Sequence, residues 1–109
     1  MTGRRRKTSP DPALQLLGLA ARGGAVVPGT GQVRDGVRAG RVRFVLVAAD
    51  LTETGRDKLV PLLEGQGVPY LVRYPRAELG RAVGRSPLAA VGVVDPGLAD
   101  RLRALLGRS

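Results

Sequence analysis

The sequence contains no cysteine and no histidine. Disulfide bonds, thiolate nucleophiles, Cys/His zinc sites and the usual proton carrier near neutral pH are therefore excluded. Aromatic residues make up only 3% of the chain, with no Trp, so we expect no stacking platform of the kind that reads single strands. No apolar run approaches the roughly 20 residues of a membrane span, and none follows the basic N-terminus as in a signal peptide. We expect a cytoplasmic protein without a membrane partner.

Negative charge is also scarce, and positive charge dominates the chain. The 109 residues carry 18 Lys and Arg against 9 Asp and Glu, a net charge of +9, and all but Lys7 and Lys58 of the cations are Arg. An excess of this size predicts a polyanionic partner, because neutralising phosphates releases their counterions. Arg also grips a phosphate or a guanine edge with two parallel hydrogen bonds. Codon bias in a GC-rich genome would explain Arg in place of Lys, but it would not explain the net charge.

The length and a hydrophobic content of 43% predict one globular domain, which we place at residues 11–109. Residues 1–10 are expected to form a flexible basic tail, which ends at a Pro-Asp-Pro sequence. The cations from Arg4 to Lys7 either contact phosphates without sequence preference or remain solvated.

The hydrophobic pattern alternates between helical and strand periods. Helices are expected at 11–22, 31–39, 53–65, 75–84 and from 96 onward, with Thr30 as the cap of the second one. Strands are expected at 25–27, 42–50, 68–74 and 88–95. Residues 44–49 are all apolar, which is typical of a strand buried on both faces. This order predicts an α/β fold, with a central sheet covered by helices on both sides.

The segment GTGQVRDGVRAG, residues 29–40, holds four glycines and raises the question of a phosphate-binding loop. The dinucleotide-binding fingerprint fails, because Arg34 stands where its third glycine must be. The P-loop pattern also fails, because Val37 and Arg38 stand where Lys and Ser or Thr are required. Neither nucleotide cradle is present.

A helix over residues 31–39 would turn Val33 and Val37 toward the core. It would expose an arc made of Gly31, Gln32, Arg34, Asp35 and Arg38. The arc begins at a helix N-terminus, where free N–H groups and the helix dipole favour phosphate, and Gln32 can both donate and accept at a base edge. On these residues alone, a solvated helix with an Asp35–Arg38 surface pair is an equally good interpretation.

Two carboxylates, Asp50 and Asp95, follow apolar strands, where open α/β sheets bind ligands, and together they could hold Mg²⁺. Helix capping is the better interpretation of both, because each stands just before an expected helix start. No Ser, Thr or Lys has a partner in the sequence that would activate it as a nucleophile. We therefore expect no enzymatic activity, no cofactor and no metal site.

Four segments of the chain resemble a known family. They are GTGQVRDGVRAG at 29–40, FVLVAAD at 44–50, GVPYLVRYPRAELGRAVG at 67–84 and AAVGVV at 89–94. In these segments the chain is similar to the kink-turn RNA-binding proteins, namely the archaeal large-subunit ribosomal protein seven-Ae family and its bacterial YlxQ-type relatives. The likeness runs from about Leu14 to Leu106, and it is most specific in the block at 68–84 and its offset from the 29–40 segment.

The resemblance implies a three-layer α/β/α sandwich, with a central mixed sheet of about four strands, that binds a sharply bent RNA internal loop. In the family, a Gly-x-Asn-Glu-x-x-Lys motif opens the second helix and reads sheared G·A pairs. An apolar loop after the fourth helix covers a flipped-out nucleotide. The residues that these two features place at the RNA, together with the neighbouring cations, are Gly29, Thr30, Gly31, Gln32, Arg34, Asp35, Arg38, Gly84, Arg85, Ser86, Pro87 and Leu88.

The chain departs from the family motif at three positions. Gly31 replaces the Asn, Gln32 replaces the Glu and Asp35 replaces the Lys. Gln32 keeps a polar partner for a base edge, as bacterial relatives do. Asp35 places a negative charge where a guanine or phosphate contact is expected, and Arg34 or Arg38 would have to supply the cation from another direction.

The sequence thus predicts a non-catalytic, ribosomal-protein-like RNA-binding protein. Its partner would be a bent, structured RNA such as rRNA or a kink-turn RNA, with the ribosome as a candidate assembly and no specificity for DNA. The alternative is a protein-interaction adaptor on the same fold, which Asp35 favours. A third interpretation, the substrate-binding part of an rRNA methyltransferase, lacks room for a catalytic half.

Overall fold

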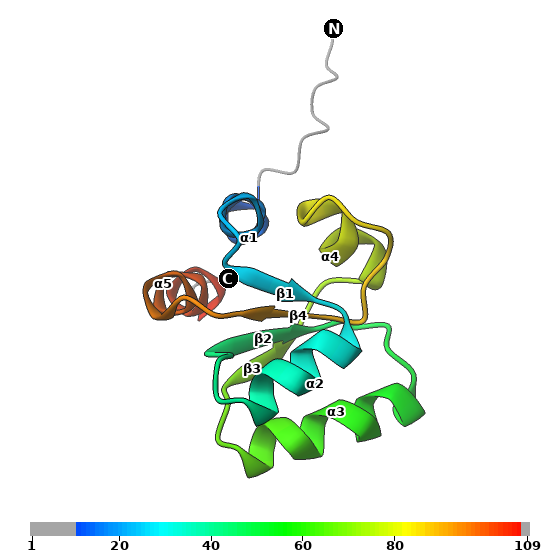
Figure 1. Cartoon of the computed structure of the whole chain (residues 1–109). Coiled ribbons are helices and arrows are strands. Elements are labelled where there is room, and N and C mark those ends of the chain that lie inside the picture. The colour runs from blue at the N-terminus through cyan, green and yellow to red at the C-terminus, as the bar shows by residue number, and fades with distance from the viewer. Residues whose placement is uncertain (1–10, 108–109) are drawn as a thin grey trace, which may run out of the picture.

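The computed structural model of the chain describes residues 11–107, so the predicted tail at 1–10 lies outside the described residues. Within residues 11–107, helices and strands alternate (Figure 1). The helices are α1 (Pro12–Arg22), α2 (Thr30–Arg38), α3 (Glu53–Gly65), α4 (Arg76–Ala82) and α5 (Pro96–Gly107). The strands are β1 (Val26–Pro28), β2 (Phe44–Val47), β3 (Tyr70–Val72) and β4 (Ala90–Val93). The predicted order of elements is confirmed; β2, β3 and β4 are shorter than predicted, and β1 is shifted by one residue.

The four strands form one mixed sheet in the order β1-β4-β2-β3. The last strand, β4, lies between β1 and β2 and is antiparallel to both, whereas β2 and β3 are parallel. Val26 pairs with Val93 and Pro28 with Val91, so the first and the last strand of the described chain are neighbours in the sheet.

Helices cover both faces of this sheet, as the sequence and the resemblance predicted. Figure 1 shows α1, α4 and α5 on one side and α2 with α3 on the other. Phe44 and Leu46 pack into the core under α1, α4 and α5, whereas Val45 and Val47 pack against α2 and α3. The four residues of β2 are at most 1% exposed, so the prediction of a strand buried on both faces is confirmed.

Polar side chains begin three of the helices. Asp11, Thr52 and Asp95 accept hydrogen bonds from backbone N–H groups in the first turns of α1, α3 and α5. Each bond satisfies a donor that has no partner inside its own helix. The capping interpretation of Asp95 is therefore confirmed.

Two other capping predictions are wrong. Thr30 is the first residue of α2 rather than its cap, and Gly29 holds the cap position with φ of +94° and no side-chain hydrogen bond. Asp50 does not begin α3; its carboxylate accepts the N–H of Arg76, the first residue of α4, at 2.9 Å. The partner of Asp50 is set by the tertiary fold, because a distant helix starts beside it.

Candidate nucleic-acid interface

The N-terminal end of α2 lies at one edge of the sheet, directly after β1. Gly29 makes the turn with a positive φ that favours glycine, and its N–H donates to the carbonyl oxygen of Ala90 at 2.8 Å. No side chain within residues 11–107 caps α2. Its first N–H groups thus remain directed outward at the positive end of the helix dipole, where an anion is favoured.

The loop at 84–88 lies against this helix start. A Cβ on Gly29 would stand 4.0 Å from the Cδ2 atom of Leu88, so the two segments are in contact range across 59 positions of the chain. The loop folds back onto α4 because Gly80 has no side chain; a Cβ there would collide with the carbonyl group of Ser86. Figure 1 shows the connection from α4 to β4 passing the beginning of α2. The structure therefore brings together the two segments in which the sequence placed the site.

The exposed face of α2 follows the predicted arc, with one exception. Val33 and Val37 are at most 2% exposed and face the core, while Gly31, Gln32, Asp35 and Arg38 are exposed. Arg34 is half-buried, and its Nε atom is buried without a hydrogen-bond partner among the described residues. The Cα atom of Arg38 lies roughly 12 Å beyond that of Thr30 along the helix axis, at 1.5 Å per residue. The arc therefore leads away from the 84–88 loop.

The carboxylate of Asp35 is available to solvent. It lies 4.0 Å from the guanidinium of Arg38, and the two side chains are 80% and 54% exposed. An exposed pair at this distance contributes little to stability. It does offset one positive charge on the exposed face of α2.

Two arginines that the sequence reasoning missed lie at the same edge. The guanidinium Nε of Arg76 is 3.5 Å from Asp50, and the carbonyl oxygen of Arg76 accepts the N–H of Leu88 at 3.1 Å. Arg56 reaches the carbonyl oxygen of Ala49 through Nη2 at 3.5 Å. The sequence signalled this edge only through Asp50, which follows β2 and lies beside the start of α4 in the folded chain.

The Asp50 carboxylate is held in its charged form. The backbone N–H of Arg76, and then the charge of that residue, lower the pKa of Asp50 below its ordinary value. The group thus anchors the start of α4. Asp50 and Asp95 do not converge with other ligands: residues 11–107 contain no group of three or more His, Cys, Asp or Glu side chains that could hold a metal ion.

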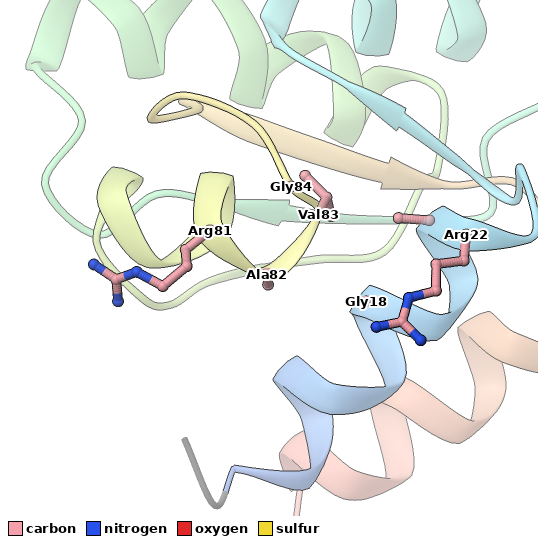
Figure 2. Close-up of a pocket in the computed structure, with 7 residues that line it drawn as sticks. Gly18, Arg22, Arg81, Ala82, Val83 and Gly84 are labelled. Atoms are coloured by element: carbon pink, nitrogen blue, oxygen red, sulfur yellow. The ribbon is translucent and has the colours of Figure 1, made fainter. Parts of the chain in front are cut away.

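A groove of about 280 Å³ between α1 and α4 reaches the same loop at Gly84 (Figure 2). Gly18 lets the helices approach closely, since a Cβ there would stand 2.9 Å from the carbonyl oxygen of Ala82. Figure 2 shows the Arg81 guanidinium directed away from the groove, whereas the Arg22 side chain runs back along α1. Both arginines stand in the last turns of their helices, where a cation complements the helix dipole. That role accounts for their charge without a ligand.

The comparisons with known proteins identify the family of the chain. The profile of the family described as "Ribosomal protein L7Ae/L30e/S12e/Gadd45 family" matches residues 11–103. The chain belongs to this family. Its L7Ae-type resemblance, stated above from the sequence segments, is thereby confirmed.

Relatives within the L7Ae family carry ribosomal and RNA-binding names. The chain is 33% identical over 91 residues to "Large ribosomal subunit protein eL8" of Thermoplasma volcanium, which covers 83% of the chain and 75% of that protein. It is 29% identical over 94 residues to "RNA-binding protein YlxQ" of Enterococcus faecium, which covers 86% of the chain and 90% of that protein. These names are those of non-enzymatic proteins, in agreement with the prediction that the chain is not an enzyme.

Solved structures show the same fold. A protein with unknown function from Bacillus halodurans C superposes with a TM-score of 0.85 at 34% identity, over 89% of the chain and 98% of that structure. The Giardia lamblia 15.5kD RNA binding protein superposes with a TM-score of 0.74 over 99% of the chain and 96% of that structure. At 22% identity, the second likeness supports the fold alone. Among the described helices of the L7Ae-family chain, none is long and apolar enough to cross a membrane.

Proposed function

We propose that this L7Ae-family chain binds a bent, structured RNA of the kink-turn type, such as a segment of rRNA. The observation that carries the proposal is the contact between the N-terminal end of α2 and the 84–88 loop, at the point where Gly29 faces Leu88. The names of the eL8 and YlxQ relatives support RNA as the partner. The ribosome is the candidate assembly, and the cytoplasm is the expected location.

The two segments have complementary chemistry for such an RNA. The uncapped N–H groups of α2 favour a phosphate, and Gln32, which is exposed beside them, can donate and accept at a base edge. Pro87 and Leu88 offer an apolar surface to a base that has left the stack. A kink exposes phosphates, base edges and an unstacked base within a short distance of one another, and this edge of the sheet offers a partner for each.

Arg76 and Arg56 supply positive charge in place of the family's Lys, which is Asp35 in this chain. Both lie at the edge formed by Ala49, Asp50 and Leu88, and both guanidinium groups are only partly engaged by the protein. Arginine at such a place can fork a phosphate with two hydrogen bonds. We infer that phosphate contacts move from the α2 position of the family's Lys toward these two residues.

Substitution of Gln32 tests the base-edge contact. We expect Gln32→Ala to weaken binding to a kink-turn RNA by about 1–3 kcal/mol, the range for a lost base-edge contact. The matched control is Gln66→Ala, because Gln66 is an exposed glutamine at the end of α3, outside the candidate site. Titrations at two salt concentrations, against a kinked RNA and a straight duplex, measure the effect. Equal affinities of the parent and Gln32→Ala for the kinked RNA would contradict the contact.

Restoring the family's cation tests the role of Asp35. Asp35→Lys should tighten binding to the kink-turn RNA more than to a straight duplex, because it removes a repelled carboxylate and adds a charge beside Gln32. The control, Asp57→Lys, makes the same change of charge at an exposed position on α3. If both variants tighten both RNAs equally, the effect is general and α2 is not the recognition helix.

A protein-interaction adaptor on the same fold is the second candidate. The observation that favours it is the Asp35 side chain, which is 80% exposed on the face where the family carries a cation. The same two titrations decide between the candidates. An adaptor would show no preference for the kinked RNA and no loss of affinity in Gln32→Ala.

A further inference from the structure

Tyr74 adopts a backbone conformation that tyrosine rarely takes. Its φ is +67°, and it is the only non-glycine residue with a positive φ within residues 11–107. The left-handed region is costly for a side chain of this size, so the conformation persists only where the surrounding structure holds it. Such residues concentrate at functional sites, which raises the question of what this one positions.

Three contacts hold Tyr74 in place. Its hydroxyl donates to Oδ2 of Asp11 at 2.7 Å, and its carbonyl oxygen accepts the N–H of Ala49 at 2.8 Å. The guanidinium carbon of Arg73 lies 5.4 Å from the centre of its ring, within the range of a cation–π contact. Desolvation and the bond to Asp11 raise the pKa of Tyr74, as expected for a hydroxyl held in its neutral form. The ring thus joins the start of α1 to the turn between β3 and α4.

The turn that Tyr74 makes leads directly into the candidate RNA edge. Pro75 holds the cap position of α4 without a side-chain hydrogen bond, and Arg76 follows as the first helical residue. The N–H of Arg76 is fixed on Asp50, and its carbonyl oxygen is fixed on the N–H of Leu88. Two residues after the strained position, the backbone therefore sets both the Arg76 guanidinium and the loop beside Gly29.

We propose that Tyr74 is a positioning residue for RNA binding. Its hydroxyl and ring hold a left-handed turn that presents Arg76 and Leu88 to the RNA next to the N-terminal end of α2. The inference rests on the proposed function, since it assigns to Tyr74 the geometry of that same site. It goes further in naming a residue that never touches the RNA.

Tyr70 provides the matched control. Its hydroxyl also donates to a carboxylate, Oε2 of Glu64, at 2.8 Å, and it belongs to the neighbouring strand β3. It packs with Val45 and Val47 on the opposite face of the sheet, and its φ is not positive. Tyr70→Phe and Tyr74→Phe therefore remove the same kind of hydrogen bond, but only the second hydroxyl holds the turn before Arg76.

The experiment measures the melting temperature and the affinity for a kink-turn RNA and a straight duplex in the parent and both variants. We expect both variants to lower the melting temperature slightly. Tyr74→Phe should weaken the kinked RNA by about three- to tenfold, the equivalent of one hydrogen bond, and Tyr70→Phe should leave it within about twofold. Tyr74→Gly relieves the backbone strain but leaves the turn unheld, so it should weaken the kinked RNA more than Tyr74→Phe does.

The outcomes separate the inference from the proposed function. If the parent shows no preference for the kinked RNA, the proposed function is wrong and the inference falls with it. If the parent shows the preference and Tyr74→Phe keeps the parent affinity while losing thermal stability, Tyr74 is merely structural and the inference is overturned. It is also overturned if Tyr74→Phe weakens the straight duplex as much as the kinked RNA. Should Tyr74→Gly fail to fold, the two Phe variants still decide.

Discussion

Gly80 and Gly31 both lie in helices, but only Gly80 is closely packed against another segment of the chain. A Cβ on Gly80 would collide with the backbone of Ser86, whereas a Cβ on Gly31 would meet nothing within 4 Å. We expect Gly80→Ala to lower the free energy of unfolding by about 1–3 kcal/mol, the usual cost of forcing atoms into a packed site. Gly31→Ala should raise it by about 0.5–1 kcal/mol, because alanine suits a helix better. Urea unfolding of both variants measures the difference.

Gly80→Ala should also weaken RNA binding, since the collision displaces the 84–88 loop from the start of α2. A Gly80→Ala variant with parent stability and parent affinity would contradict the packing of this loop on α4.

The two tyrosine hydroxyls predict how stability responds to alkaline pH. The pKa of Tyr74 is raised mainly by desolvation, and the pKa of Tyr70 is raised mainly by its hydrogen bond to Glu64. Folding thus favours the neutral hydroxyls: their contribution is complete below the ordinary tyrosine pKa of about 10 and is lost as the pH rises above it. Thermal unfolding between about pH 9 and 11 should show a falling melting temperature. Tyr74→Phe should flatten this fall, and an unchanged slope in that variant would contradict the assignment.

Thr52 and Thr30, which stand at the starts of α3 and α2, should respond differently to the same substitution. Thr52 accepts the N–H of Gly55 at 3.1 Å and begins α3, whereas Thr30 is already helical and caps nothing. Thr52→Ala should cost about 1 kcal/mol of unfolding free energy, and Thr30→Ala should cost clearly less. Denaturant titration compares them, and equal losses would show that the cap of α3 is not the source of the effect.

We expect an introduced charge to have different effects in the central strand β2 and in the edge strand β3. Val45 is 0% exposed in β2, and Val72 is 39% exposed in β3 at the edge of the sheet. Val45→Asp should unfold the chain, because an unpaired charge between two helical layers costs several kcal/mol. Val72→Asp should remain folded, because its carboxylate can reach water. Circular dichroism of both variants checks the placement of β2.

The helices and strands were predictable because their signals are local. Residues 44–49 are continuously apolar, and glycine or proline stands near most element boundaries. The capping prediction for Asp50 failed because its hydrogen-bond partner is not local. Asp50 bonds to Arg76, which lies 26 positions later, instead of to the helix that follows it. The strand order could not be predicted either, since nothing in the alternation of helices and strands places β4 between β1 and β2.

The candidate site was predicted in its parts but not as a whole. The exposed arc of α2 followed from helical periodicity, and the 84–88 loop followed from the resemblance to the family. Arg76 and Arg56 were missed, because only the folded chain brings the start of α4 and the first turns of α3 beside Asp50 and Ala49. Tyr74 was expected at the end of a strand, and no sequence pattern signals a tyrosine with a positive φ.

The charge of the whole molecule makes a further prediction about the N-terminal segment. Residues 1–10 contain four cations and no acidic residue, so their removal lowers the net charge from +9 to +5. Deleting them should weaken all RNAs alike and reduce the dependence of affinity on salt, because fewer counterions are released. The melting temperature should stay unchanged. Selective loss of one RNA would show that this segment reads sequence or shape.

Because β4 lies between β1 and β2, the candidate site can form only after β4 has been synthesised. The N–H of Gly29 is bonded to Ala90, and within residues 11–107 the edge strand β1 pairs only with β4. A nascent chain that stops after α4 already contains Gln32, Arg56 and Arg76, yet it lacks the strand that joins their segments. Closing so long a stretch of chain is slow compared with forming the helices. The proposed RNA site is therefore complete only after β4 has joined the sheet.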